Sequence, residues 1–404
     1  MMKHATTGRR RVLVVGLGIS GITTALRLQR LGWEPVILER AAGRRRGGYA
    51  VALFGTGVAS ATRLGVLDAV GNRLGPPIRT FEVDRSGRRR EGMGVPDLPG
   101  GPRLVLRGDI ENALFSALPP AVEIRFATSP VAIDQDEHGV DVTMLDAATG
   151  ATARERFDLV IGADGLRSTV RRLVFGPHAA FLRPMHYMIG ACVLRGALDG
   201  HATSDGLVMA EAGRSAWVFP FVDHAPTVLF SYRVEDVAAQ LRRPAIESVR
   251  AAFGPAPAGP ILSRLFADYA AADERLFDSV EQVCMDRWHR GRVVLLGDAA
   301  WCLTLYSGMG ASTGMAGGEL LGDMLARHPD DLPRALAAWE AKLRPFVVSL
   351  QRSATTMRQF FTPSGELPRL LRAAFVRLSS SPLAPVLQRL LRPGGLTERD
   401  IVAA

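Results

Sequence analysis

The arrangement of apolar and polar residues near the N-terminus predicts a βαβ unit. Val12 to Val15 form a short apolar run that ends at a glycine, as a buried parallel strand does. Apolar residues then recur at a helical period through residues 20–31, and residues 36–39 form a second strand-like run. The chain therefore begins with two parallel strands joined by a helix.

Further along, the pattern changes to short strands separated by turn residues. Residues 80–83 and 88–91 flank Ser86-Gly87, which predicts a hairpin. Residues 186–233 are rich in β-branched and aromatic residues and are interrupted by glycines, which predicts an antiparallel sheet that forms its own layer. Two buried strands, at residues 159–161 and 293–296, resemble those of the N-terminal unit, and the chain is mostly helical after Gly317.

The C-terminal helices carry leucines at helical spacing beside arginines. One stripe runs from Leu367 to Leu378, and a second runs from Leu383 to Leu391. A basic amphipathic helix either packs its apolar stripe on its own domain or lies on an anionic membrane surface. Of these alternatives, packing on the domain is the expected one.

Composition narrows the class of protein. The 404 residues carry a formal charge of +9, but the arginine clusters are not interleaved with aromatic residues or set in a nucleic-acid-binding motif. Three distant cysteines give no disulfide framework or metal spacing, the first ten residues contain no apolar signal segment, and no run has the length of a membrane helix. We therefore expect a cytoplasmic protein without nucleic acid, metal or integral membrane segment, as a monomer or homodimer.

The first chemical motif is a dinucleotide fingerprint. The segment Gly16-Leu17-Gly18-Ile19-Ser20-Gly21 is G-x-G-x-x-G, directly after a predicted strand and at the start of a predicted helix. The first glycine permits a tight turn, the second lets the backbone approach a pyrophosphate, and the third allows close helix packing. The free N–H groups of the helix start favour phosphates, and Glu39, at the end of the next strand, can accept hydrogen bonds from ribose hydroxyls. This motif alone does not separate FAD from NAD.

Two later strands also end at an acidic residue beside glycine. Residues 157–171 contain Asp164-Gly165, and residues 291–300 contain Gly297-Asp298. The second strand is followed by residues 307–312, a glycine loop that opens a helix. A carboxylate there can bind ribityl hydroxyls, and the helix start can stabilise negative charge on a reduced flavin ring.

With three such segments in this order, the chain resembles the flavoprotein aromatic hydroxylases of the p-hydroxybenzoate hydroxylase type. It is most similar to the single-component monooxygenases that include tetracycline-modifying and polyketide-tailoring enzymes, over roughly residues 10–350. The family motif D-G-x-x-S-x-x-R is met by Asp164, Gly165, Ser168 and Arg171. The resemblance implies that FAD is bound and that NAD(P)H is a transient co-substrate. The cofactor-binding residues expected from the motifs and the resemblance are Gly16, Gly18, Ile19, Ser20, Gly21, Glu39, Arg40, Arg46, Arg107, Asp164, Asp298, Gly308, Gly310 and Ala311.

The expected fold is therefore α/β, with a Rossmann-like FAD-binding domain, an antiparallel-sheet substrate domain and C-terminal helices. Residues 1–178 and 280–328 are assigned to the FAD-binding domain, and residues 80–97 either belong to it or contribute to the substrate layer. Residues 179–279 are assigned to the substrate-binding sheet, and residues 329–404 to the C-terminal helical region.

The resemblance implies that NAD(P)H reduces the flavin and that O₂ forms a flavin C4a-hydroperoxide, which hydroxylates an electron-rich substrate. Many apolar residues in the predicted sheet indicate a bulky aromatic or polycyclic compound, as in natural-product biosynthesis or modification. The candidates for the wall of its pocket are Met188, Met209, Trp217, Phe219, Phe221, Phe230 and Tyr306. Because side chains alternate between the two faces of a strand, only about half of the strand residues among them can face the pocket. No catalytic acid or base is assigned.

Two positions depart from the family pattern, because Trp301 and Leu305 stand where histidine and proline are usual. These departures keep open a flavin dehydrogenase or reductase that inserts no oxygen. A flavin halogenase is less favoured, because its W-x-W-x-I-P signature is absent. A flavin-holding accessory protein without turnover is a further alternative, although all three cofactor motifs are intact.

Overall fold

The computed structural model describes residues 9–44, 47–75, 78–98, 100–379 and 395–403. A six-stranded sheet of order β17-β18-β11-β1-β2-β7 forms its centre. Its strands are β1 (Arg11–Val15), β2 (Glu34–Leu38), β7 (Glu123–Arg125), β11 (Leu159–Gly162), β17 (His289–Arg290) and β18 (Val293–Leu295). All neighbours pair in parallel except β17, and β1 is central, with Val12 opposite both Leu159 and Pro35. The predicted βαβ start is thus present, and β11 and β18 are the two further buried strands.

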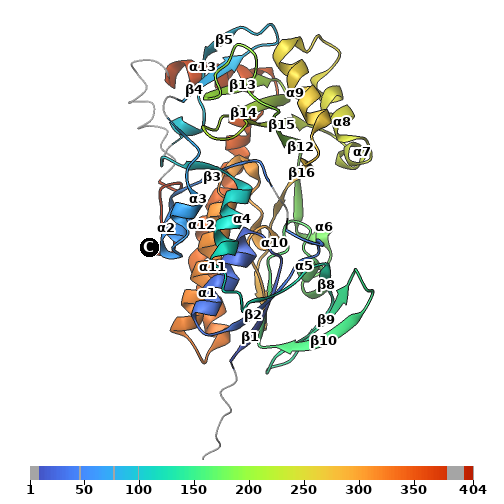
Figure 1. Cartoon of the computed structure of the whole chain (residues 1–404), viewed down its shortest axis with the longest axis vertical. Helices are drawn as coiled ribbons and strands as arrows, with labels where there is room; N and C mark the ends of the chain where they lie inside the picture. The colour runs from blue at the N-terminus through green and yellow to red at the C-terminus, as the bar shows by residue number, and fades with distance from the viewer. Residues whose placement is uncertain (1–8, 45–46, 76–77, 99, 380–394, 404) are drawn as a thin grey trace, which may run out of the picture.

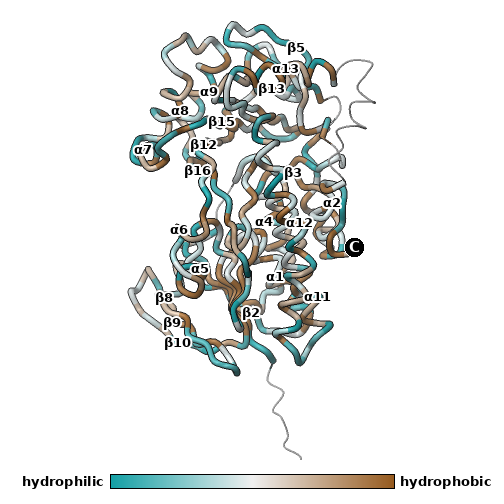
Figure 2. The backbone as a smooth tube through the Cα atoms, turned by 180° about the vertical axis from the view of Figure 1, so that it is seen from behind, coloured by the Kyte–Doolittle hydropathy of each residue, from teal (hydrophilic) through white to brown (hydrophobic). Residues whose placement is uncertain are grey.

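Helices and a strand meander flank this sheet (Figure 1). The helices are α1 (Ile19–Arg30), α2 (Gly55–Arg63), α3 (Leu67–Val70), α4 (Arg107–Ser116) and α11 (Gly310–Arg327). The meander comprises β8 (Thr128–Gln135), β9 (Val140–Asp146) and β10 (Thr152–Phe157), and α5 (Thr169–Val174) and α6 (His178–Phe181) lie near it. In Figure 2 the strands of the central sheet are largely hydrophobic, whereas the outer strand β10 is largely hydrophilic.

A seven-stranded sheet of order β16-β12-β15-β14-β13-β4-β5 lies at the other end of the molecule (Figure 1). Its strands are β4 (Arg79–Val83), β5 (Arg89–Glu91), β12 (Leu182–Val193), β13 (Asp205–Glu211), β14 (Arg214–Phe219), β15 (Thr227–Arg233) and β16 (Arg275–Val283). One face is covered by α7 (Val237–Leu241), α8 (Ala245–Phe253) and α9 (Gly259–Ala271), around a cluster that includes Phe230, Phe253 and Phe266. Strands β4 and β5 show that residues 79–91 contribute to this second sheet.

Short elements and the C-terminal helices join the two halves. The short elements are β3 (Ala50–Leu53), η1 (Val95–Asp97), β6 (Arg103–Leu106), α10 (Asp298–Trp301) and η2 (Leu305–Ser307). The long helix α12 (Leu332–Phe361) packs on α11 and η2 and leads to α13 (Glu366–Ser379) near β13. Among the described residues, no helix is both long and apolar enough to span a membrane.

The apolar stripe of α13 does not pack as expected. Leu367, Leu370 and Leu371 are 68%, 55% and 63% exposed, whereas Arg372 of the same helix is buried. The helix therefore presents a positively charged residue to the domain and leaves these leucines accessible to solvent, with Leu371 at the cavity. The second stripe, Leu383 to Leu391, lies outside the described residues.

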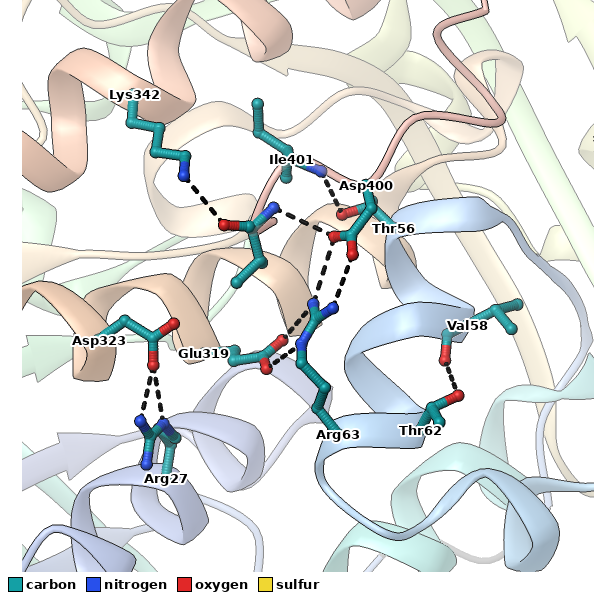
Figure 3. Close-up of polar contacts among 11 residues, drawn as sticks. Arg27, Thr56, Val58, Thr62, Arg63, Glu319, Asp323, Lys342, Asp400 and Ile401 are labelled. Atoms are coloured by element: carbon teal, nitrogen blue, oxygen red, sulfur yellow. Dashed lines mark hydrogen bonds and ion pairs between the residues drawn. The ribbon is translucent and has the colours of Figure 1, made fainter. Parts of the chain in front are cut away.

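The C-terminal segment returns to the first half of the molecule (Figure 3). Arg63 of α2 makes paired hydrogen bonds to Glu319 of α11 and to Asp400. Lys342 donates a hydrogen bond to the backbone carbonyl of Val402 at 2.9 Å, and Ile401 and Val402 are buried in the main core. Residues 395–403 are thereby held against α2, α11 and α12.

Candidate functional site

A cavity of about 1470 Å³ lies between the central sheet and the seven-stranded sheet. The carboxyl ends of β1, β2 and β11 open into it, together with the loops after them and after β18. Ligands of open parallel sheets bind at this edge, because the loops and helix starts gather there. All three predicted motifs therefore border one cavity, although they lie far apart in the sequence.

The three glycines of the first motif have different surroundings. Gly16 has φ +113°, and a Cβ there would lie 2.4 Å from the carbonyl oxygen of Ala163. A Cβ on Gly21 would lie 2.0 Å from the carbonyl oxygen of Gly16, so α1 passes this turn at a distance that only glycine allows. A Cβ on Gly18 would meet no protein atom closer than 3.6 Å, and Gly18 lines the cavity. The turn and the packing thus use Gly16 and Gly21, and Gly18 leaves room for a ligand.

Glu39 holds the turn and borders the cavity. One carboxylate oxygen accepts a hydrogen bond from the backbone N–H of Leu17 at 3.1 Å, and the other accepts one from Ala41 at 2.9 Å. Ile19, Ser20 and Arg40 also line this part of the cavity. Arg46 lies outside the described residues.

The second motif is a hydrogen-bonded turn anchored to the third motif. Asp164 lines the cavity and accepts hydrogen bonds from Ser168 Oγ at 2.5 Å and from the N–H of Thr169 at 2.6 Å. Burial raises the pKa of Asp164, and these bonds oppose the rise. The buried Arg171 donates to the carbonyl oxygens of Leu166 at 2.7 Å and Ala299 at 2.8 Å. Arg171 therefore fixes the turn after β11 to the helix after β18.

The third motif supplies a carboxylate to the wall of the cavity. Asp298 is open to the cavity but enclosed by protein elsewhere, and this enclosure raises its pKa while Arg107 lowers it. Arg107 begins α4, lines the same cavity and donates from Nε to Glu111 at 3.0 Å. Burial would lower the pKa of Arg107, but Tyr49, Glu111 and Asp298 together raise it above its ordinary value. The arginine therefore stays charged beside the second glycine of the first motif.

The glycine loop continues this wall into helix α11. Gly308 is left-handed with φ +66°. Gly310 is the first residue of α11, and a Cβ at this position would meet no protein atom within 4 Å. Gly308, Gly310 and Ala311 all line the cavity. The helix start thus faces open space, where its N–H groups can bind a negatively charged group.

The two departures from the family pattern occupy different environments. Trp301 is buried against Trp288 and Trp339, with ring centroids 4.6 Å and 6.0 Å away, and does not line the cavity. Leu305 does line it. Replacement of the usual histidine therefore enlarges the aromatic core, and only Leu305 changes the cavity wall.

These residues fit FAD. The cradle at Gly18 and Gly310, the carboxylates Glu39 and Asp298, and the cation Arg107 would match its phosphates, ribose, ribityl chain and ring. When bound, FAD would supply the redox chemistry. The protein would supply the positions and the electrostatics of the site.

Comparison with known proteins identifies the family. A family model described as an FAD binding domain matches residues 9–347. The chain belongs to this family. It is 32% identical over 356 residues to an uncharacterised protein of Mycobacterium tuberculosis, covering 84% of this chain and 91% of that protein. It is 26% identical over 377 residues to a flavin-dependent monooxygenase of Legionella longbeachae, covering 89% and 91% of the two chains.

The solved structures give the same result. The tetracycline destructase Tet(51) matches with a TM-score of 0.75 and 25% identity, covering 92% of this chain and 96% of that one. The protein is an FAD-dependent monooxygenase of the aromatic hydroxylase type, and the predicted family, α/β fold and enzyme class are confirmed.

The predicted substrate wall is partly wrong. Phe219 and Tyr306 line the cavity. Met188, Met209 and Phe230 instead point to the opposite face of the sheet, where α8 and α9 cover them. The error is one of strand phase, because successive residues alternate between the two faces and hydrophobicity alone does not tell which face a helix layer covers.

Two further aromatic residues lie near the cavity but do not line it. Trp217 shares a face with Phe219, but its ring packs on Phe361 at 4.8 Å and its Nε1 donates to the Phe361 carbonyl oxygen. Phe221 is buried in a separate cluster with Leu104 and Leu106. The C-terminal helix α12 thus occupies the space that Trp217 was expected to face.

Sequence reasoning missed several residues that line this end of the cavity. They come from the alternate positions of the two strands and from the C-terminal helices. They include Ile189, Thr227, Leu229, Met357, Phe360, Phe361, Leu371, Arg372 and Phe375. The alternation of side chains between the two faces of β12 and β15 could have identified the strand residues. Nothing in the sequence indicated that α12 and α13 reach the cavity.

Proposed function

We propose that this monooxygenase consumes NAD(P)H and O₂ to hydroxylate a bulky aromatic or polycyclic substrate through a flavin hydroperoxide, in natural-product biosynthesis or modification. The observation that carries the proposal is the size and composition of the cavity. Its volume of about 1470 Å³ includes the FAD cradle together with a further space at the seven-stranded sheet. Beyond the FAD cradle, its walls are mainly aliphatic and aromatic, as at Ile189, Phe219 and Phe361.

The chain's own residues would position the reactants. Gly16, Gly18, Glu39 and Arg107 would bind the adenosine and phosphate half of FAD, and Asp298 with the start of α11 would bind the other half. Apolar side chains around the remaining space would exclude water, which favours oxygen transfer over loss of peroxide. Tyr306 stays protonated, because burial raises its pKa, and its hydroxyl shares a 2.8 Å hydrogen bond with Ser231.

The relatives support this substrate class by analogy. Tet(51) is named a tetracycline destructase, and tetracycline is a polycyclic aromatic natural product. A dehydrogenase or reductase without oxygen insertion is the alternative, and its remaining structural basis is Leu305 in the cavity wall. The monomeric or homodimeric state and the cytoplasmic location stay predictions from the sequence.

The test begins with a visible spectrum of the purified protein, followed by anaerobic reduction with NADPH or NADH. Air is then readmitted with polycyclic phenols, and products are analysed by mass spectrometry. We expect flavin bands that bleach with the nicotinamide and a product that is heavier by one oxygen atom. Reduction without any oxygenated product, across a broad range of polycycles, would favour the dehydrogenase instead.

A further inference from the structure

The arginine that α13 presents to the cavity is already neutralised by a carboxylate. Arg372 lines the cavity, and its side chain is only 4% exposed. Its two terminal nitrogens donate to the two carboxylate oxygens of Glu82 at 2.9 Å and 2.7 Å, and its Nε donates to the carbonyl oxygen of Phe360. Such a fork-to-fork pair uses the guanidinium edges that a ligand carboxylate would need.

The second arginine at this end is paired in the same way. Arg167 lines the cavity and donates to both carboxylate oxygens of Asp278, at 2.9 Å and 2.8 Å. Glu281 lies 3.6 Å from the same guanidinium. Two more carboxylates, Asp97 and Glu398, line the cavity outside the FAD cradle. Among the described lining residues beyond that cradle, carboxylates therefore outnumber arginines, which opposes the entry of an anion.

We propose that the substrate is an uncharged polycycle and that aromatic carboxylates are excluded from this cavity. This inference rests on the proposed function, since it specifies the substrate of the same cavity. A carboxylate would be buried beside existing carboxylates, with both nearby arginines already paired, which is costly. A neutral phenol or quinone brings no such charge into the cavity.

Two anthraquinones that differ in one group test the exclusion of anions. Chrysophanol carries a methyl group where rhein carries a carboxylate, and their dissociation constants are measured by equilibrium dialysis against the FAD-loaded protein. We expect rhein to bind at least about tenfold more weakly than chrysophanol, the size of effect that about 1.4 kcal/mol produces. Equal or tighter binding of rhein, or binding of neither compound, would overturn the proposal.

Glu82→Gln separates the charge from the shape of the cavity. It keeps a hydrogen-bonding partner for Arg372 but removes the compensating charge, so rhein should gain affinity until the two compounds differ by about threefold or less. The control Glu91→Gln changes an exposed residue of the neighbouring strand β5 and should keep the wild-type difference. Flavin content of each variant verifies folding. An unchanged preference in Glu82→Gln would contradict the charge argument.

Oxygenation of an aromatic carboxylate would overturn this inference but leave the proposed function intact. Tighter binding of chrysophanol than of rhein, without oxygenation of any compound, would support this inference but contradict the proposed function.

Discussion

The two ends of the cavity are built from different kinds of sequence information. At the cofactor end, each contribution is a short continuous segment that follows a parallel strand, such as residues 16–21 after β1. At the substrate end, the wall combines single residues from β12, β15 and β16 with side chains of η2, α12 and α13. Parallel strands bring their carboxyl ends together whatever the loops contain, whereas the second wall exists only after long-range packing.

Because of this difference, cofactor binding can stay constant within the family while substrate recognition varies. The cofactor end uses backbone N–H groups, glycines and a few charges, which any member of the family can retain. The substrate end uses side chains that can change singly without disturbing the central sheet. Redox chemistry can therefore stay fixed while substrate recognition diverges.

The largest expected effect comes from the first motif, where neighbouring glycines should respond differently. Gly21→Ala places a methyl group 2.0 Å from a backbone oxygen, so we expect the apoprotein to lose at least about 4 kcal/mol of unfolding free energy. Gly18→Ala meets no close protein atom and should leave that free energy nearly unchanged. It should instead weaken FAD binding at least about tenfold, because the methyl group enters the pyrophosphate space.

Urea unfolding of the apoproteins and flavin fluorescence titration measure these two quantities separately. If Gly18→Ala destabilised the apoprotein as much as Gly21→Ala, the division between a packing glycine and a ligand-facing glycine would be wrong.

The next effect concerns the anchor between the second and third motifs. Arg171→Met removes the hydrogen bonds to the buried carbonyl group of Ala299 and to the partly buried carbonyl group of Leu166. We expect a loss of about 3 kcal/mol in the unfolding free energy. Arg172→Met is the matched control, because Arg172 is exposed on the same helix. Equal losses in urea unfolding for the two variants would show that the buried bonds contribute little.

The sequence predicted that the three motifs meet at one place, because the signals of each motif are local. A strand, a glycine turn and an acidic residue can be recognised without knowing what packs on them, and Gly16, Glu39, Asp164 and Asp298 do border one cavity. The substrate end was predicted poorly because its residues depend on strand phase and helix position. Phe230 and Leu229 are neighbours on β15 with similar hydrophobicity, yet Leu229 lines the cavity and Phe230 lies beneath α9.

The C-terminal segment belongs to neither class, because it reaches the cavity from the far end of the chain. Thr397 and Glu398 line the cavity, and the carbonyl oxygen of Thr397 accepts a hydrogen bond from Gly55. The attachment depends on Asp400, whose side chain is 27% exposed and bonds to Arg63 (Figure 3). Burial raises the pKa of Asp400, but the hydrogen bond and the charge of Arg63, together with backbone hydrogen bonds from Val402 and Ala403, outweigh this rise, so the pKa lies below its usual value.

The smallest expected effect follows from this ion pair and depends on pH. Because the folded pKa of Asp400 is depressed, its contribution to stability is present above the unfolded pKa of about 3.9 and is lost as the pH falls through the folded pKa. Asp400→Asn should therefore cost about 1 kcal/mol at pH 7 and progressively less below pH 4. Urea unfolding at several pH values measures this, with Asp330→Asn as the control, since Asp330 is 92% exposed. A cost that stayed the same across this range would mean that the carboxylate charge does not hold the C-terminal segment in place, leaving the buried Ile401 and Val402 as its attachment.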